Sequence, residues 1–223
     1  MCGALSRAHR FKQKFRYISP TAVDLWLVRS DLTAMTKIIS LSQIADVRIA
    51  NAARGAVPAA QAGRRRALTS GALDLLASGQ VEHLSWLPDE ELTGVRTLEG
   101  GDVVLLARGG LRAVAYDGPS GVIVPFSPLM VLRVKAPERA DPRYLATFLN
   151  LPSTRMRAEA EMQGTSIRML GRKEVDALNI PLPPLSRQRL IAELAELHMR
   201  EEALLRGLSR ARSHLLAALC AAE

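Results

Sequence analysis

The stretch that decides the fold is residues 100–134, GGDVVLLARGGLRAVAYDGPSGVIVPFSPLMVLRV. It holds four runs of β-branched or aliphatic residues, and short segments rich in glycine and proline separate them. The runs are residues 103–107, 111–116, 122–124 and 129–134. Connections this short leave no room for the helix that joins parallel strands. The stretch therefore predicts an antiparallel β meander, and it argues against a parallel nucleotide-binding sheet.

The first connection contains Gly109-Gly110, a pair that could in principle cradle a phosphate. No helical pattern follows it, and phosphate loops normally lead into a helix N-terminus. We interpret the pair as a tight hairpin turn.

Two helices are predicted after the strands. Asp141 followed by Pro142 is typical of a helix start, with an oxygen cap and proline at the first helical position. The buried stripe of this helix consists of Tyr144, Leu145, Phe148 and Leu149. A second helix is expected from about Ser153 to Gln163, stopping at Gly164.

The segment before the double proline Pro183-Pro184 predicts a helical turn over residues 171–177 and a strand over residues 178–182. Together with the meander, these elements indicate an α+β fold.

The last element begins near Ser186, a plausible N-cap, and continues without proline to Glu223. Alternating steps of four and three residues from Leu190 to Ala218 meet eight apolar residues in nine positions, with Glu201 as the exception. A helix on the order of 50 Å is too long for one small domain to cover, and its pattern favours a partner helix in a coiled-coil-like pair. The alternative is a helix packed back on its own domain. The residues predicted to mediate dimerisation are Leu190, Leu194, Leu197, Leu204, Leu208 and Leu215.

Upstream of the strands the pattern is weaker. Residues 41–47 have helical apolar spacing with Ser40 as a candidate cap, and residues 50–71 predict a loop or an irregular strand pair. Residues 1–34 form a basic leader without sustained period, which is either an arm laid along DNA or the product of a start codon placed too early. We expect a domain over 35–183 and a long spacer or dimerisation helix over 184–223.

Composition bounds the function. The chain has 223 residues, with 48% hydrophobic and 23% charged, which excludes the disordered and collagenous classes. Its formal charge of +8 is uneven, because residues 1–70 hold 12 Lys and Arg against 3 acids. A local basic segment is the footprint of a phosphate-backbone binder. The residues predicted to contact DNA are Arg54, Arg64, Arg65 and Arg66, with Arg108 and Arg112 on the sheet turn.

No catalytic motif is visible. The two cysteines and four histidines lack metal-ligand or disulfide spacing, and neither a nuclease Asp/Glu-x-Lys element, a methyltransferase Pro-Pro-aromatic clamp nor a Walker loop occurs. The apolar runs are far shorter than a membrane span. We therefore expect a non-catalytic cytoplasmic protein with no catalytic residue, no cofactor, no metal and no membrane association.

Several strings in order resemble the specificity (S) subunits of type I restriction-modification systems. Residues 101–110, GDVVLLARGG, resemble their Gly-Asp, strand and Arg-x-Gly turn, and residues 141–150 look like their following helix. Gly164-Thr165-Ser166 and the later IPLPPLSRQRLI of residues 180–191 resemble the segment that closes a target recognition domain and enters the conserved helix. One departure is Arg187, where the family usually has an acid before the glutamine.

The resemblance implies one target recognition domain and one spacer helix, where a full S subunit has two of each. Such a chain would read one half of a bipartite site in double-stranded DNA. Its partners would be an adenine methyltransferase (M) subunit, a restriction (R) subunit and a second copy bound through the C-terminal helix. Two alternatives stay open: a recognition module of another restriction or phage-defence complex, and a helical scaffold protein without a DNA role.

Overall fold

The computed structural model describes residues 36–53, 55–88, 90, 94–162 and 168–220. Its contacts divide the chain into two compact units, Met1–Lys37 and Ile38–Glu223. The leader predicted over 1–34 and the domain start predicted near Met35 lie outside the described residues. The main sheet and all of the described helices belong to the second unit.

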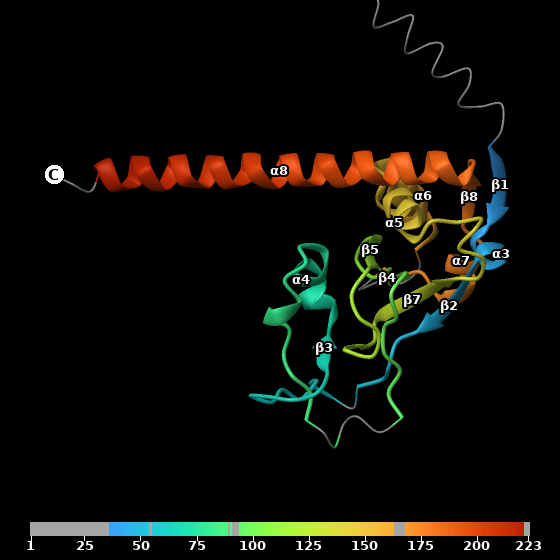
Figure 1. The fold of residues 1–223 in the computed structure, drawn as a ribbon, viewed down its shortest axis with the longest axis horizontal. Coiled ribbons are helices and arrows are strands. Elements are labelled where there is room, and N and C mark those ends of the chain that lie inside the picture. Colours follow the sequence, from blue (N-terminus) through green and yellow to red (C-terminus); the bar gives the residue numbers. More distant parts are fainter. Residues whose placement is uncertain (1–35, 54, 89, 91–93, 163–167, 221–223) are drawn as a thin grey trace, which may run out of the picture. The chain divides into compact units, whose positions relative to one another are not determined.

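The main sheet is antiparallel and has the strand order β2-β7-β4-β5 (Figure 1). Its strands are β2 (Ala45–Ile49), β7 (Leu129–Val134), β4 (Asp102–Leu106) and β5 (Arg112–Tyr116). Strands form in all four predicted runs and the antiparallel sheet is confirmed, but the sheet is not the predicted four-strand meander. The order is not strictly sequential, because β7 returns along the free side of β4 and places Val131 opposite Val104.

The third predicted run, β6 (Ile123–Pro125), leaves this sheet and pairs in parallel with β3 (Arg66–Leu68). A third small sheet joins β1 (Lys37–Ser40) to β8 (Asn179–Leu182). Residues 50–71 are largely irregular apart from β3, as expected. Short helical turns follow at η1 (Ser70–Ala72), α4 (Leu73–Ala77) and η2 (Val81–His83).

The helix predicted over residues 41–47 is wrong beyond its first turn. Helix α3 covers only Leu41–Ile44, and the chain then enters β2, whose Val47 pairs with Leu132 of β7. The apolar residues of this segment also fit an alternating strand, and pairing with a buried strand decides between the two periods. Ser40 occupies the N-cap position but makes no side-chain cap hydrogen bond.

The helices after the sheet begin where the sequence predicts. Helix α5 spans Pro142–Asn150, and the Asp141 Oδ1 accepts hydrogen bonds from the backbone N–H groups of Arg143 (2.8 Å) and Tyr144 (3.4 Å). Helix α6 spans Pro152–Glu161 and α7 spans Arg172–Asp176. The predicted stop at Gly164 lies outside the described residues.

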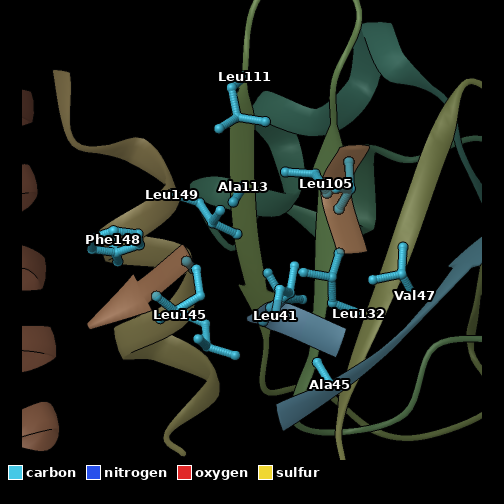
Figure 2. Close-up of a cluster of buried hydrophobic side chains, with 14 of the residues drawn as sticks. Leu41, Ala45, Val47, Leu105, Leu111, Ala113, Leu132, Leu145, Phe148 and Leu149 are labelled. Atoms are coloured by element: carbon cyan, nitrogen blue, oxygen red, sulfur yellow. The ribbon is translucent and has the colours of Figure 1, made fainter. Parts of the chain in front are cut away.

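The main sheet is buried on both faces, which explains why its strands are almost continuously apolar. On one face Leu105 and Leu132 pack with Leu145 and Leu149 of α5, all fully buried (Figure 2). On the other face Val104 joins a second cluster with residues of α4 and β6. Successive side chains of each strand point to opposite faces of the sheet, so each strand contributes to both cores.

Helix α8 spans Leu185–Cys220, 36 residues, and begins one residue before the predicted cap Ser186. At 1.5 Å per residue it is about 54 Å long. Only Gln188 and Ala192 are buried in it. The first turns of α8 therefore pack against the chain's own domain, and the rest of the helix does not. No helix within the described ranges combines the length and apolar character needed to cross a bilayer.

Candidate nucleic-acid interface

The turn between β4 and β5 presents an exposed arginine on a braced backbone. Gly109 and Gly110 adopt φ angles of 69° and 142°, which favour glycine, so the predicted tight turn is confirmed. The Gly109 N–H donates to the Arg168 carbonyl (2.9 Å), and the Leu170 N–H donates to the Ala107 carbonyl (3.0 Å). This pairing places Arg108 next to a second exposed cation, Arg168.

Arg112, at the start of β5, is not a free cation. Its guanidinium forms an ion pair with the carboxylate of Asp74 in α4. The contact joins the sheet to α4, although both side chains are substantially exposed, at 43% and 71%. Part of the charge that Arg112 could offer to a phosphate is therefore already balanced.

The three-arginine run divides into an exposed and an internal part. Arg64 is exposed and Arg65 is partly exposed. Arg66 donates from Nη1 to the carbonyls of Glu82 (2.6 Å) and Leu84 (2.7 Å), and its guanidinium lies 3.7 Å above the centroid of the Trp86 ring. Arg66 thus fastens the run to η2 and to the chain segment that follows it.

The backbone of the run is fixed as well. The Leu87 N–H donates to the Arg65 carbonyl (2.9 Å), and the Ala67 N–H donates to the Ser85 carbonyl (2.8 Å). A Cβ added to Gly63 would lie 2.5 Å from the Leu87 carbonyl oxygen, so this approach requires glycine. The remaining predicted DNA-binding residue, Arg54, lies outside the described residues.

A buried carboxylate anchors a cluster of charges that sequence reasoning missed. Asp102 is 1% exposed and accepts two hydrogen bonds from Arg133, at 2.8 and 2.9 Å. Arg48 lies 3.5 Å from the same carboxylate and donates to the Thr97 carbonyl at 2.9 Å. Glu99 pairs with Arg133 at 2.8 Å. The Gly-Asp motif can be recognised in the sequence, but the partners of Asp102 cannot be predicted from it, because Arg133 and Arg48 lie far from Asp102 along the chain.

Electrostatics within the cluster follow from burial and pairing. Hydrogen bonding to Asp102 raises the pKa of Arg133, against an opposing effect of burial. Burial lowers the pKa of Arg48. The Asp102 carboxylate opposes this effect, and the neighbouring cations Arg133 and Arg96 add to it. The nearby Arg96 is exposed.

Asn51 holds the backbone of Arg96 from both sides. Its Nδ2 donates to the Arg96 carbonyl (2.7 Å), and its Oδ1 accepts from the Arg96 N–H (2.9 Å). The arginine side chain is thereby displayed from a fixed position. No sequence signal singled it out, because the clamp joins residues 45 positions apart.

The predicted dimerisation residues share one property: each is an exposed leucine on α8. Their exposed fractions are 55% for Leu190, 58% for Leu194, 59% for Leu197, 76% for Leu204, 49% for Leu208 and 61% for Leu215. The structure thus leaves all six leucines uncovered by the rest of the described chain.

Within the part of the chain that the structure describes, no group of three or more His, Cys, Asp or Glu side chains could hold a metal ion. Buried Tyr144 has a pKa raised to about 12 by desolvation, and its hydroxyl donates to the Pro181 carbonyl at 2.5 Å. This tyrosine has a structural role.

No protein-family model and no curated protein matches the chain. Solved structures do match. The type I restriction-modification S subunit from M. genitalium has a TM-score of 0.54 and 13% identity, over 79% of this chain and 42% of that one. A chain described with the assembly and conformational transition of the type I system has a TM-score of 0.54 and 18% identity, over 95% of this chain and 53% of that one.

This chain spans about half the length of the structures it matches. At these identities the likeness concerns the fold, and a match over 95% of this chain includes most of the domain and most of the helix that follows it. The chain has the α+β fold of one half of a type I restriction-modification S subunit.

Proposed function

We propose that this chain is the DNA-recognition subunit of a type I restriction-modification complex, non-catalytic itself, which reads one half of a bipartite site and directs a methyltransferase and an endonuclease. The observation that carries the proposal is the fold match: 79% of this chain superposes on 42% of a type I restriction-modification S subunit, and 95% of it superposes on 53% of a second chain from a type I system. Residues 35–183 are the recognition domain and residues 184–223 are the spacer and dimerisation helix.

The proposed DNA contacts divide by availability. Arg64 and Arg108 are exposed, and no hydrogen bond or ion pair to other described residues involves their side chains. Both stand on braced backbone, which reduces the entropy cost of binding a phosphate. Arg54, Arg65 and Arg112 are proposed as further contacts, Arg112 after exchange of Asp74 for a phosphate oxygen. Arg66 contributes charge while holding the run in place.

The exposed leucine stripe supports a homodimer. A single domain offers few base contacts, and a two-fold dimer would place two identical readers at a fixed separation. An antiparallel helix pair puts the two domains at opposite ends of a rod, as a bipartite site requires. Glu201 lies in the stripe and would need an arginine from the second copy. Arg200 is the better candidate for this partner, because Arg206 already pairs with Glu202 of its own chain at 3.2 Å.

Sequencing the host methylome with and without the gene tests the proposal. We expect loss of one bipartite, palindromic adenine-methylation motif on deletion, and its return with the wild-type gene. An unchanged methylome, in a host with an active neighbouring methyltransferase, contradicts it.

Binding measurements decide between the remaining alternatives. Salt-dependent duplex binding without any methylation change would favour a recognition module of another defence complex. No salt-dependent duplex binding would favour a scaffold protein.

A further inference from the structure

The junction between α5 and α8 contains a fully buried glutamine whose side-chain amide makes three hydrogen bonds. Gln188 is 0% exposed. Its Oε1 accepts from the Asp141 N–H at 2.9 Å, and its Nε2 donates to the carbonyls of Arg139 and Pro183, both at 2.8 Å. One side-chain amide thus joins α8 to the start of α5 and to the segment that follows β8.

Other contacts of α8 surround this amide. Ala192, one turn further, is 0% exposed. Arg143 of α5 lies 3.6 Å from Glu196 and 3.5 Å from Asp141, whose carboxylate is also 4.0 Å from Arg189. The α8 residues that make these contacts lie between Gln188 and Glu196, within three turns of the helix.

Beyond Glu196 the helix has no hydrogen bond or ion pair to the described residues of the domain. Every residue from 197 to 220 is exposed except Gly207, which is partly exposed. The first three turns therefore fix the direction of the whole helix relative to its domain. Apolar packing alone tolerates rotation and sliding, whereas three hydrogen bonds to one planar amide fix an orientation.

The length of the helix amplifies any change at this junction. From Gln188 to Cys220 the helix rises about 48 Å at 1.5 Å per residue. A rotation of about 10° at the junction would displace its far end by roughly 8 Å, more than two base-pair steps of about 3.4 Å. A reader at the end of a rod can select a spacer length only if the junction holds that angle.

We propose that Gln188 is a positioning residue that fixes the angle between the recognition domain and α8, and so sets how sharply the dimer selects the spacer between two half-sites. The inference rests on the proposed function for its DNA consequence. Its structural part, the rigid junction, stands on the hydrogen bonds of Gln188 and the ion pairs around it.

The angle can be measured without DNA. Cys220 is exposed and accepts a spin label, and Ala77→Cys, with Cys2→Ser, supplies a second label on α4. Labelled chain diluted into excess unlabelled chain restricts the measured distance to one protomer. We expect a narrow distance distribution in the parent protein and at least a twofold broader one in Gln188→Met, which keeps the side-chain volume and removes all three hydrogen bonds.

Two further variants control this measurement. Gln188→Glu retains the acceptor for Asp141 and loses both donors, so an intermediate width is expected. It also carries the test if the methionine variant does not fold. Ser186→Ala, exposed in the same helical turn, should leave the width unchanged. Unchanged widths in both Gln188 variants would overturn the inference.

The DNA consequence is read on duplexes carrying the methylated motif with spacers lengthened or shortened by one to three base pairs. We expect the affinity of the wild-type protein to fall at least tenfold when the spacer differs by one base pair from the optimum. In Gln188→Met the same change of spacer should lower the affinity less than threefold. The affinity of this variant for a single half-site should equal that of the wild type. A sharp wild-type profile that Gln188→Met leaves intact overturns the role of Gln188. A wild-type protein with no preference for two half-sites contradicts the proposed function instead, and the distance widths still decide the junction.

Discussion

The domain and the distal part of α8, residues 197–220, are both rich in leucine, but their leucines lie in opposite environments. In the domain Leu105, Leu132 and Leu145 are 0% exposed, between the sheet and α5. In the distal helix Leu204 and Leu216 are 76% and 64% exposed. The domain completes its own core, whereas the distal helix leaves its leucines uncovered, as the proposed dimer requires. Regular apolar spacing alone does not distinguish these cases.

The largest difference is expected between two leucine-to-alanine substitutions. Leu132→Ala removes a fully buried side chain and should lower the free energy of unfolding by about 3 kcal/mol at any protein concentration. Leu204→Ala should cost stability only where the chain is dimeric, so its effect should shrink on dilution. Urea unfolding at two protein concentrations checks both. A concentration-independent loss for Leu204→Ala would show that the distal helix packs on its own domain.

A second pair compares a buried with an exposed ion pair inside the domain. Asp102→Asn removes the buried carboxylate that Arg133 and Arg48 share, while Arg133 keeps its pair with Glu99. The substitution should cost about 2 kcal/mol, below the usual value for a fully buried pair because Arg133 is 39% exposed. Asp74→Asn breaks the exposed pair with Arg112 and should cost under about 0.5 kcal/mol. Thermal melts give both numbers. Equal losses would mean that burial of Asp102 contributes nothing.

A third pair separates DNA binding from association. Arg64→Ala with Arg65→Ala should weaken binding to all duplexes alike and reduce the slope of log affinity against log salt by about 0.9 for each phosphate that is no longer neutralised. Arg210→Ala with Arg212→Ala removes the same charge from the distal helix and should leave the slope unchanged. Fluorescence anisotropy titrations at several salt concentrations test this. If the slope falls only for the helix variant, the DNA-binding surface lies on α8 and not on the domain.

The smallest effect is expected from removal of residues 1–34. Their sequence lacks the periodicity needed to contribute to a core, so the melting temperature should change by less than about 2 °C. Calorimetry of the shortened and full chains measures the shift. If the shortened chain unfolds less cooperatively than the full chain, the leader is part of the folded domain.

Sequence reasoning succeeded where the signal is local. The cap at Asp141, the turn at Gly109-Gly110 and the long uninterrupted helix α8 each depend on neighbours within one or two turns. It failed over residues 45–47, because a short apolar segment fits both periods and β7 decides between them.

Long-range pairings were equally invisible. The parallel contact of β3 with β6, the Arg112–Asp74 pair and the Arg66–Trp86 stack each join segments that no spacing rule connects. The sequence locates the candidate arginines. It does not predict how many of their hydrogen-bond donors remain free to contact DNA.

Light scattering after size-exclusion chromatography tests most directly whether the leucine stripe is half of an intermolecular core. We predict a mass twice the chain's 24.3 kDa for the wild type, and a monomer for Leu204→Glu with Leu208→Glu. The control Ala203→Glu with Ser213→Glu adds the same charge at positions outside the stripe and should remain dimeric. A monomeric wild type would contradict the homodimer, and the stripe would then have to pair with a chain supplied in trans.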